Sequence, residues 1–169
     1  MLANRIIIYP FHNESLQIPK KRFSFYREYA LFIRNTLKKP LFQHFLRWLL
    51  KRENIEKLQI KSIQIKVLPH QEKNGNSLAG RRKKDGRIFI FPINVRIYKM
   101  LVAKHGNDTI YSFVKSRARA TLIHEILHIK YSSDEEKVRR LTENYYDLYV
   151  RNPKTEDCDN IIFGILSKR

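Results

Sequence analysis

The sequence predicts an α+β fold, in which a small antiparallel β-meander packs on two consecutive helices after a basic, mainly helical N-terminal extension. Two patterns indicate it. Apolar residues recur at steps of three and four over 20–37 and 95–127, the spacing of amphipathic helices, and they alternate with polar residues over 62–67, the period of a half-buried strand. A chain of 169 residues is long enough for one domain. We expect this domain at 61–169 and the extension at 1–60.

The N-terminal sixty residues are expected to hold a short strand and two helices. Residues 5–9 are a β-branched run closed by Pro10, which indicates a strand at a sheet edge. The first helix should run from about Lys20 to Leu37 and end before Pro40, because the residue before a proline avoids the α region. Pro40 itself suits the first turn of a second helix, which reaches about residue 54.

The middle of the chain is expected to form three strands. Residues 62–67 give the first, ending at Pro69, and a second is expected around 77–83. The third, over 87–91, follows through Asp85-Gly86, a dipeptide that supplies the positive φ angles of a tight hairpin turn. Together these strands would form a three-stranded antiparallel meander.

Three more helices are expected after the strands. The first should end at Gly106, and the second should be capped by Asn107 or Asp108. The third follows a short loop, where Ser133 and Glu136 have the spacing of a capping box.

The charge of the chain is large and unevenly placed. Lys and Arg total 34 against 16 Asp and Glu, a formal net charge of +18. The excess lies in residues 1–130, whereas 131–169 is about neutral, so a polyanion should meet the N-terminal and middle parts. The one cysteine, Cys158, cannot form an internal disulfide. The lack of a disulfide pair favours a reducing setting, so we expect a cytoplasmic protein. No apolar run approaches the roughly 18 residues of a membrane span.

The chemistry is expected on the helix that ends near Lys130, which contains His124-Glu125-Ile126-Leu127-His128. Residues four apart lie on one helix face a turn apart, so the two imidazoles can converge on one zinc ion at about 2.0 to 2.1 Å. Glu125 lies beside them, where its carboxylate can take a proton from a water on that ion and return it later. The alternative is a coincidence of two surface or capped histidines.

A catalytic zinc site needs a third protein ligand and an open fourth position. No histidine follows His128 and no cysteine is near, so the third ligand should be a carboxylate of the next helix. Glu135 is favoured because it shares a seam with Val138 and Thr142, the face that would pack on the preceding helix. The alternatives are Glu143, Glu136 and Asp134.

A meander, a helix with HEILH, a short loop and a helix beginning DEEKVRRLTENYY together resemble the gluzincin zinc metallopeptidases, above all the minimal archaeal minigluzincins. The resemblance covers about residues 60–150. It implies Glu125 as the base or acid of peptide hydrolysis. The implied ligands of one zinc ion are His124, His128 and Glu135. The related pattern Glu-x-x-Ala-Asn/Asp has Val138 and Arg139 at its last two positions here.

Two functions are therefore expected. The first is a zinc-dependent metallopeptidase, active or latent, that hydrolyses a peptide or protein held along an extended strand at 77–82. The alternative is a basic nucleic-acid-binding protein with a structural or relic zinc site. The segment from Lys20 to Arg52 contains ten basic residues and a single acidic one, Glu28. A peptidase acting on proteins bound to nucleic acid would unite the two. Candidate donors to an oxyanion are Tyr131, Tyr145 and Tyr146.

Overall fold

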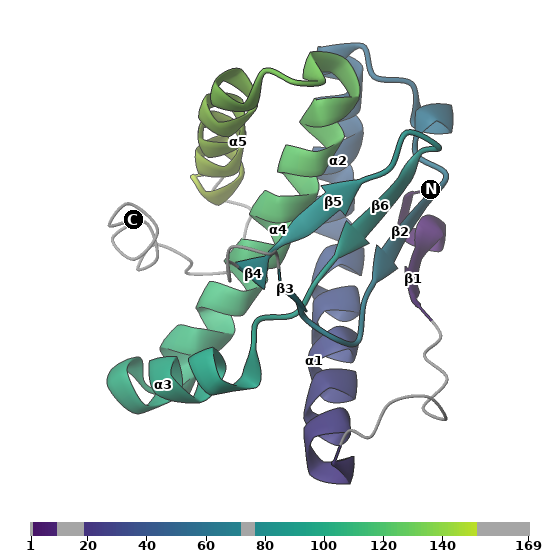
Figure 1. Ribbon diagram of the computed structural model, residues 1–169. Coiled ribbons are helices and arrows are strands. Elements are labelled where there is room, and N and C mark those ends of the chain that lie inside the picture. The colour runs from purple at the N-terminus through teal and green to yellow at the C-terminus, as the bar shows by residue number, and fades with distance from the viewer. Residues whose placement is uncertain (1, 10–18, 72–76, 152–169) are drawn as a thin grey trace.

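A computed structural model describes residues 2–9, 19–71 and 77–151, and its fold is α+β (Figure 1). A 3-10 turn over Leu2–Arg5 leads into β1, and another over Lys57–Gln59 precedes β2. The strands are β1 (Ile6–Ile8), β2 (Ser62–Ile65), β3 (His70–Gln71), β4 (Ser77–Leu78), β5 (Gly80–Arg82) and β6 (Arg87–Ile90). The helices are α1 (Lys20–Lys38), α2 (Pro40–Glu53), α3 (Val95–His105), α4 (Asn107–Tyr131) and α5 (Glu135–Val150).

Local signals set most helix ends. Pro40 occupies the first turn of α2, as expected, and α2 ends where Asn54 takes a left-handed conformation with φ 53°. The side chain of Asn94 caps α3, and Gly106, with φ 80°, ends it. The expected cap of α4 is wrong, because Asn107 already lies inside that helix and Gly106 precedes it.

The main sheet has four strands in the order β1-β2-β6-β5. Strand β2 lies parallel to both β1 and β6, and only β5 and β6 form an antiparallel pair. The expected antiparallel meander is therefore wrong. The hairpin turn at Asp85-Gly86 is confirmed, with φ 86° at Gly86, and β1 lies at a sheet edge as expected. The second expected strand is split, because β4 pairs with β3 in a separate ribbon before β5 joins β6.

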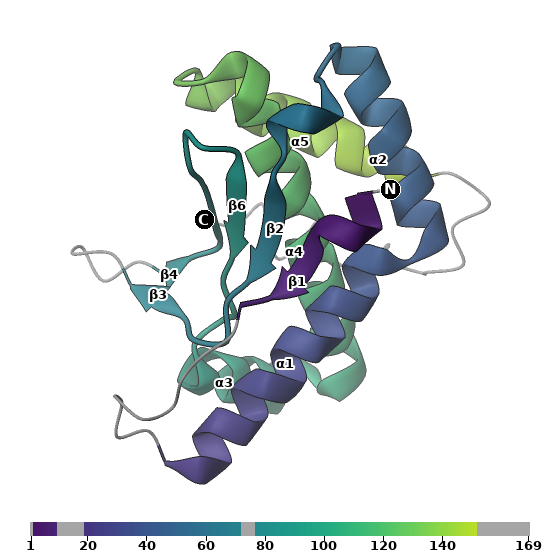
Figure 2. The ribbon, with the colours of Figure 1, turned by 90° about the vertical axis from the view of Figure 1, so that its right-hand side faces the viewer.

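One hydrophobic core lies between the sheet and the helices. Inward-facing isoleucines of the central strands are fully buried there: Ile63, Ile65, Ile88 and Ile90. Helices α1 and α4 lie side by side on that face (Figures 1 and 2). The expected boundary at residue 60 falls just before β2, and β1, α1 and α2 contribute to the same core. Within the described ranges, no helix combines the length and apolar character required to cross a bilayer.

Candidate metal centre

A tight reversal joins α4 to α5 and packs the two helices against each other (Figure 1). Ser132 has φ 46°, and its N–H donates to the carbonyl of His128. The side chain of Asp134 accepts a hydrogen bond from the N–H of Lys137 at 3.0 Å and so caps α5. The expected capping box of Ser133 and Glu136 is wrong, because the helix is capped one residue later. This reversal brings the first turn of α5 beside the last turns of α4.

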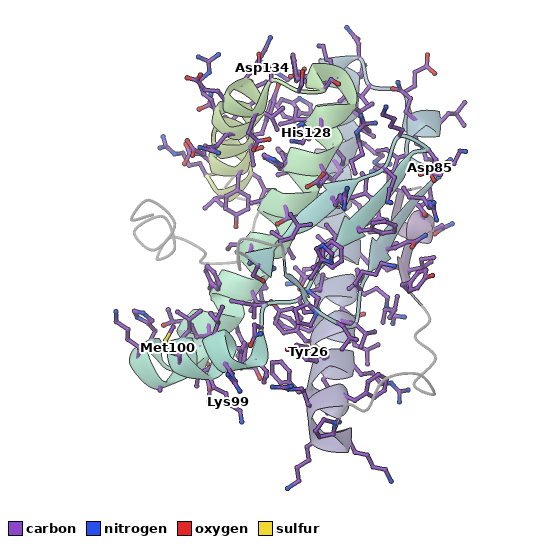
Figure 3. The ribbon with its side chains drawn as sticks, in the orientation of Figure 1. Tyr26, Asp85, Lys99, Met100, His128 and Asp134 are labelled. Carbon is purple, nitrogen blue, oxygen red and sulfur yellow. The ribbon has the colours of Figure 1, made fainter. Side chains whose placement is uncertain are left out.

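Two histidines and one glutamate converge across this helix pair. The Nε2 atoms of His124 and His128 are 3.1 Å apart. The carboxylate of Glu135 lies 3.4 Å from the first of these nitrogens and 3.2 Å from the second. All three ligand atoms lie within 4.8 Å of one another. Figure 3 shows His128 on α4 close to the start of α5, where Asp134 is labelled.

The hydrogen bonds of the other ring nitrogens fix which tautomer each histidine adopts. The Nδ1–H of His128 donates to the carbonyl of Ser132 at 2.7 Å. The hydroxyl of Thr142 gives its proton to the carbonyl of Val138 at 2.7 Å, so it can only accept from the Nδ1–H of His124, at 3.3 Å. Both Nε2 atoms then present lone pairs. Two lone pairs and a carboxylate at these distances repel one another unless a cation lies between them.

This donor set fits a zinc ion. Two neutral imidazoles and one carboxylate are three protein ligands of the kind found in catalytic zinc sites, and they leave a fourth position open. Burial lowers the pKa of His124, against the opposing effect of the Glu135 carboxylate, and so favours the neutral imidazole that a metal requires. The side chain of Glu135 is 54% exposed, so the site opens to solvent on its α5 side.

Glu125 is held between α4 and the edge strand β5. It is 7% exposed, and the backbone N–H of Arg82 donates to its carboxylate. Burial raises the pKa of Glu125 to about 7, although the hydrogen bond from the Arg82 N–H acts in the opposite direction. The carboxyl group can therefore accept and release a proton near neutral pH.

The close approach of β5 to α4 depends on Gly80. A Cβ atom at this position would lie 2.5 Å from Thr121 Cγ2 and 2.9 Å from Glu125 Oε1. A side chain here would displace the carboxylate or push the strand away from the helix. An isolated glycine in a strand is the sequence signal for such an approach.

Of the four carboxylates considered for the third ligand, the structure brings Glu135 to the histidines. The side chain of Asp134 caps α5 instead. Glu136 and Glu143 are exposed and lie outside the group of ligand atoms that could share a metal ion among the described residues.

Another buried carboxylate, that of Glu53 at the end of α2, connects the helices around the site through hydrogen bonds. It is buried and accepts hydrogen bonds from Tyr145 and from Tyr131, the latter at 2.7 Å, while Lys130 lies 3.1 Å away. Burial raises the pKa of Glu53, but these three donors outweigh it and lower the pKa overall. The hydroxyls of Tyr131 and Tyr145, expected as oxyanion donors, therefore donate to Glu53 in this structure.

The sequence did not point to Glu53 or to the role of the Thr142 hydroxyl. Glu53 lies 77 residues before Lys130, and nothing local marks such a contact. For Thr142 the signal in the sequence was only weak. The related metallopeptidase pattern has Asn or Asp at the position of Arg139, so a polar residue was expected on this helix, but not at position 142.

No family model matches the chain, and neither a curated protein nor a solved structure matches it.

Proposed function

We propose that the protein is a zinc-dependent metallopeptidase of the gluzincin type, which hydrolyses peptide bonds with Glu125 as base and acid. The observation that carries the proposal is the convergence of three ligand atoms from His124, His128 and Glu135, with both histidine tautomers fixed, beside a buried glutamate whose pKa is raised to about 7. A site that needed zinc only to join two helices would not require the buried acid.

Each residue has a separate task in this mechanism. A zinc ion, when bound, would polarise the substrate carbonyl and lower the pKa of a water nearby. The carbonyl of Ser132 and the hydroxyl of Thr142 hold the imidazoles with their Nε2 atoms directed at the ion. Glu125 takes a proton from the attacking water and gives it to the leaving amine, and its raised pKa suits both transfers.

Strand β5 is the last strand of the main sheet among the described residues, and its outer edge offers a place for the substrate. The N–H of Lys83 and the carbonyl of Ala79 bond to β6, so the backbone groups of Gly80 and Arg82 point to the other side of the strand. One of them, the Arg82 N–H, holds Glu125. The remaining groups can pair with an extended peptide added as a further strand, which would place a scissile bond near Glu125.

Metal content and hydrolysis together test the proposal. We expect about one zinc per chain by elemental analysis of protein purified without added metal, and its loss in Glu135→Ala but not in Glu143→Ala. With a quenched fluorescent peptide library, Glu125→Gln should keep zinc and lose hydrolysis, whereas His124→Ala should lose both. Hydrolysis by Glu125→Gln would contradict the mechanism. Absence of zinc even after reconstitution would favour the basic nucleic-acid-binding protein instead.

A further inference from the structure

The face of the main sheet that points away from the helices carries a row of outward side chains. Because side chains alternate along a strand, the residues between the buried isoleucines point outward. The strand register places one outward residue of each strand side by side, in the order Ile7, Gln64, Phe89 and Arg81. Both ribbon views show α1 and α4 on the opposite face (Figures 1 and 2).

Four cations from three segments gather on this outer face: Lys66, Arg81, Lys83 and Arg87. The Nζ of Lys66 lies 3.2 Å from the ring centroid of Tyr9 and 4.4 Å from that of Phe89. Burial lowers the pKa of Lys66, and the charges of Arg87 and Lys83 lower it further. Positive charge is therefore crowded here, and an anion placed among these groups would relieve the repulsion.

Little acidic charge balances these cations. Among the described residues, Asp85 is the acid that pairs with this group, and it bonds to Arg87 at 2.6 Å. Lys66, Arg81 and Lys83 have no ion pair within the same described ranges. Three cations on one face are therefore available to phosphate groups.

An aromatic ring lies beside the cations. Tyr9, at the edge of the sheet, is 41% exposed although Lys66 covers one side of its ring. Phe89, in the middle of the face, is covered by the same lysine and is only 8% exposed. The ring of Tyr9 can therefore stack on a flat ligand, whereas the centre of the face can interact with a ligand through the positive charge of Lys66.

We propose that this outer sheet face, lined by Tyr9, Lys66, Arg81, Lys83 and Arg87, binds single-stranded nucleic acid. Phosphates contact Lys66, Arg81 and Lys83, and a base stacks on Tyr9. A sheet face with cations and an exposed ring at its edge suits a strand with unpaired bases. Proteins recognise the bases of a duplex with a helix or a β-ribbon that enters a groove. The flat outer face of this sheet does not project such an element.

The binding face and the candidate metal centre share strand β5. Arg81 points to the outer face, whereas Gly80 and Arg82 border Glu125 on the other side. A protein bound to the same nucleic acid would thus be held near the centre. The binding proposal does not rest on the metallopeptidase, since it needs no metal and no hydrolysis.

Fluorescence anisotropy with a labelled 20-nucleotide oligothymidylate tests the proposal between 50 and 300 mM NaCl in the presence of EDTA. Three phosphate contacts predict a slope of log K against log salt of about −2.1. The triple variant Lys66→Gln/Arg81→Gln/Lys83→Gln should reduce that slope by about 2 and weaken binding about tenfold or more at 100 mM NaCl. The matched control removes three exposed charges from the start of α1: Lys20→Gln, Lys21→Gln and Arg22→Gln. It should change the affinity less than about threefold, because those side chains do not line the sheet face.

Tyr9→Leu separates stacking from charge. It should weaken binding about tenfold and leave the salt slope unchanged, because stacking releases no counterions. Unchanged thermal unfolding would show that each variant is folded, and the exposed pair Arg81→Gln/Lys83→Gln replaces the triple variant if Lys66→Gln unfolds the protein. Equal losses in the sheet and α1 variants would overturn the proposal, as would tighter binding of a 20-base-pair duplex than of the single strand.

Discussion

Replacing Glu125 with glutamine should stabilise the metal-free protein, and the gain should grow with pH. The folded protein raises the pKa of Glu125 from 4.5 to about 7, mainly because the group is buried. A carboxyl whose folded pKa lies above its unfolded pKa contributes its stability fully below the unfolded value. That contribution is lost as pH rises through the folded value. The shift of about 2.5 units corresponds to about 3 kcal/mol of unfolding free energy as an upper limit.

Urea unfolding in EDTA between pH 4 and pH 8 measures this effect. The difference in unfolding free energy between Glu125→Gln and the unaltered protein should rise by up to about 3 kcal/mol over that range. In melting temperature this is about 6 to 12 °C for a chain of this size. The exposed Glu143→Gln variant is the matched control, and its difference should stay flat. A difference for Glu125→Gln that does not change with pH would refute the argument that this carboxyl is costly to ionise.

The remaining predictions concern the groups around Glu125 and the histidines. Thr142→Val should weaken zinc binding about 10- to 100-fold in a competition titration, because His124 loses its hydrogen-bond acceptor, whereas Thr142→Ser should retain the affinity. Gly80→Ala should destabilise the protein by about 1–3 kcal/mol in urea unfolding and reduce hydrolysis, since its Cβ would meet Thr121 and Glu125; an unchanged variant would mean that β5 moves freely. Glu53→Gln should lower the unfolding free energy of the metal-free protein by about 1–3 kcal/mol, because its hydrogen bonds are buried, and the exposed Glu136→Gln should not.

The features that follow from local spacing could be predicted from the sequence. The first helix was expected from Lys20 to Leu37 and runs from Lys20 to Lys38, because the spacing of its apolar residues and the following Pro40 determine it. The pair His124 and His128 shares one helix face for the same local reason. Glu135 was favoured from its place on the packing face of its own helix, and the structure brings it to both histidines.

The pairing of the strands and the support of the site could not be predicted in this way. The alternation over 62–67 tells which face of a strand is buried but not which strand lies beside it, so the parallel pairing of β2 with β6 was missed. The contact of Glu53 with Tyr145 spans 92 residues and depends on how α2 docks. Such contacts are set by the packing of whole elements, which no short window of sequence contains.

In the metal-free protein the site destabilises the folded state. The groups responsible are the ones that the proposed chemistry needs. Two Nε2 lone pairs are 3.1 Å apart beside the Glu135 carboxylate, and Glu125 is buried where its charge is disfavoured. The contacts that oppose this cost lie just outside the site, in the packing of α4 on α5 and in the hydrogen bonds of Glu53. A cation at the three ligands would reverse the sign of their interaction, so binding should stabilise the fold by about 4 kcal/mol at a free zinc concentration 1,000 times the dissociation constant. The same helix packing that tolerates the repulsion thus keeps the ligands in place for the ion.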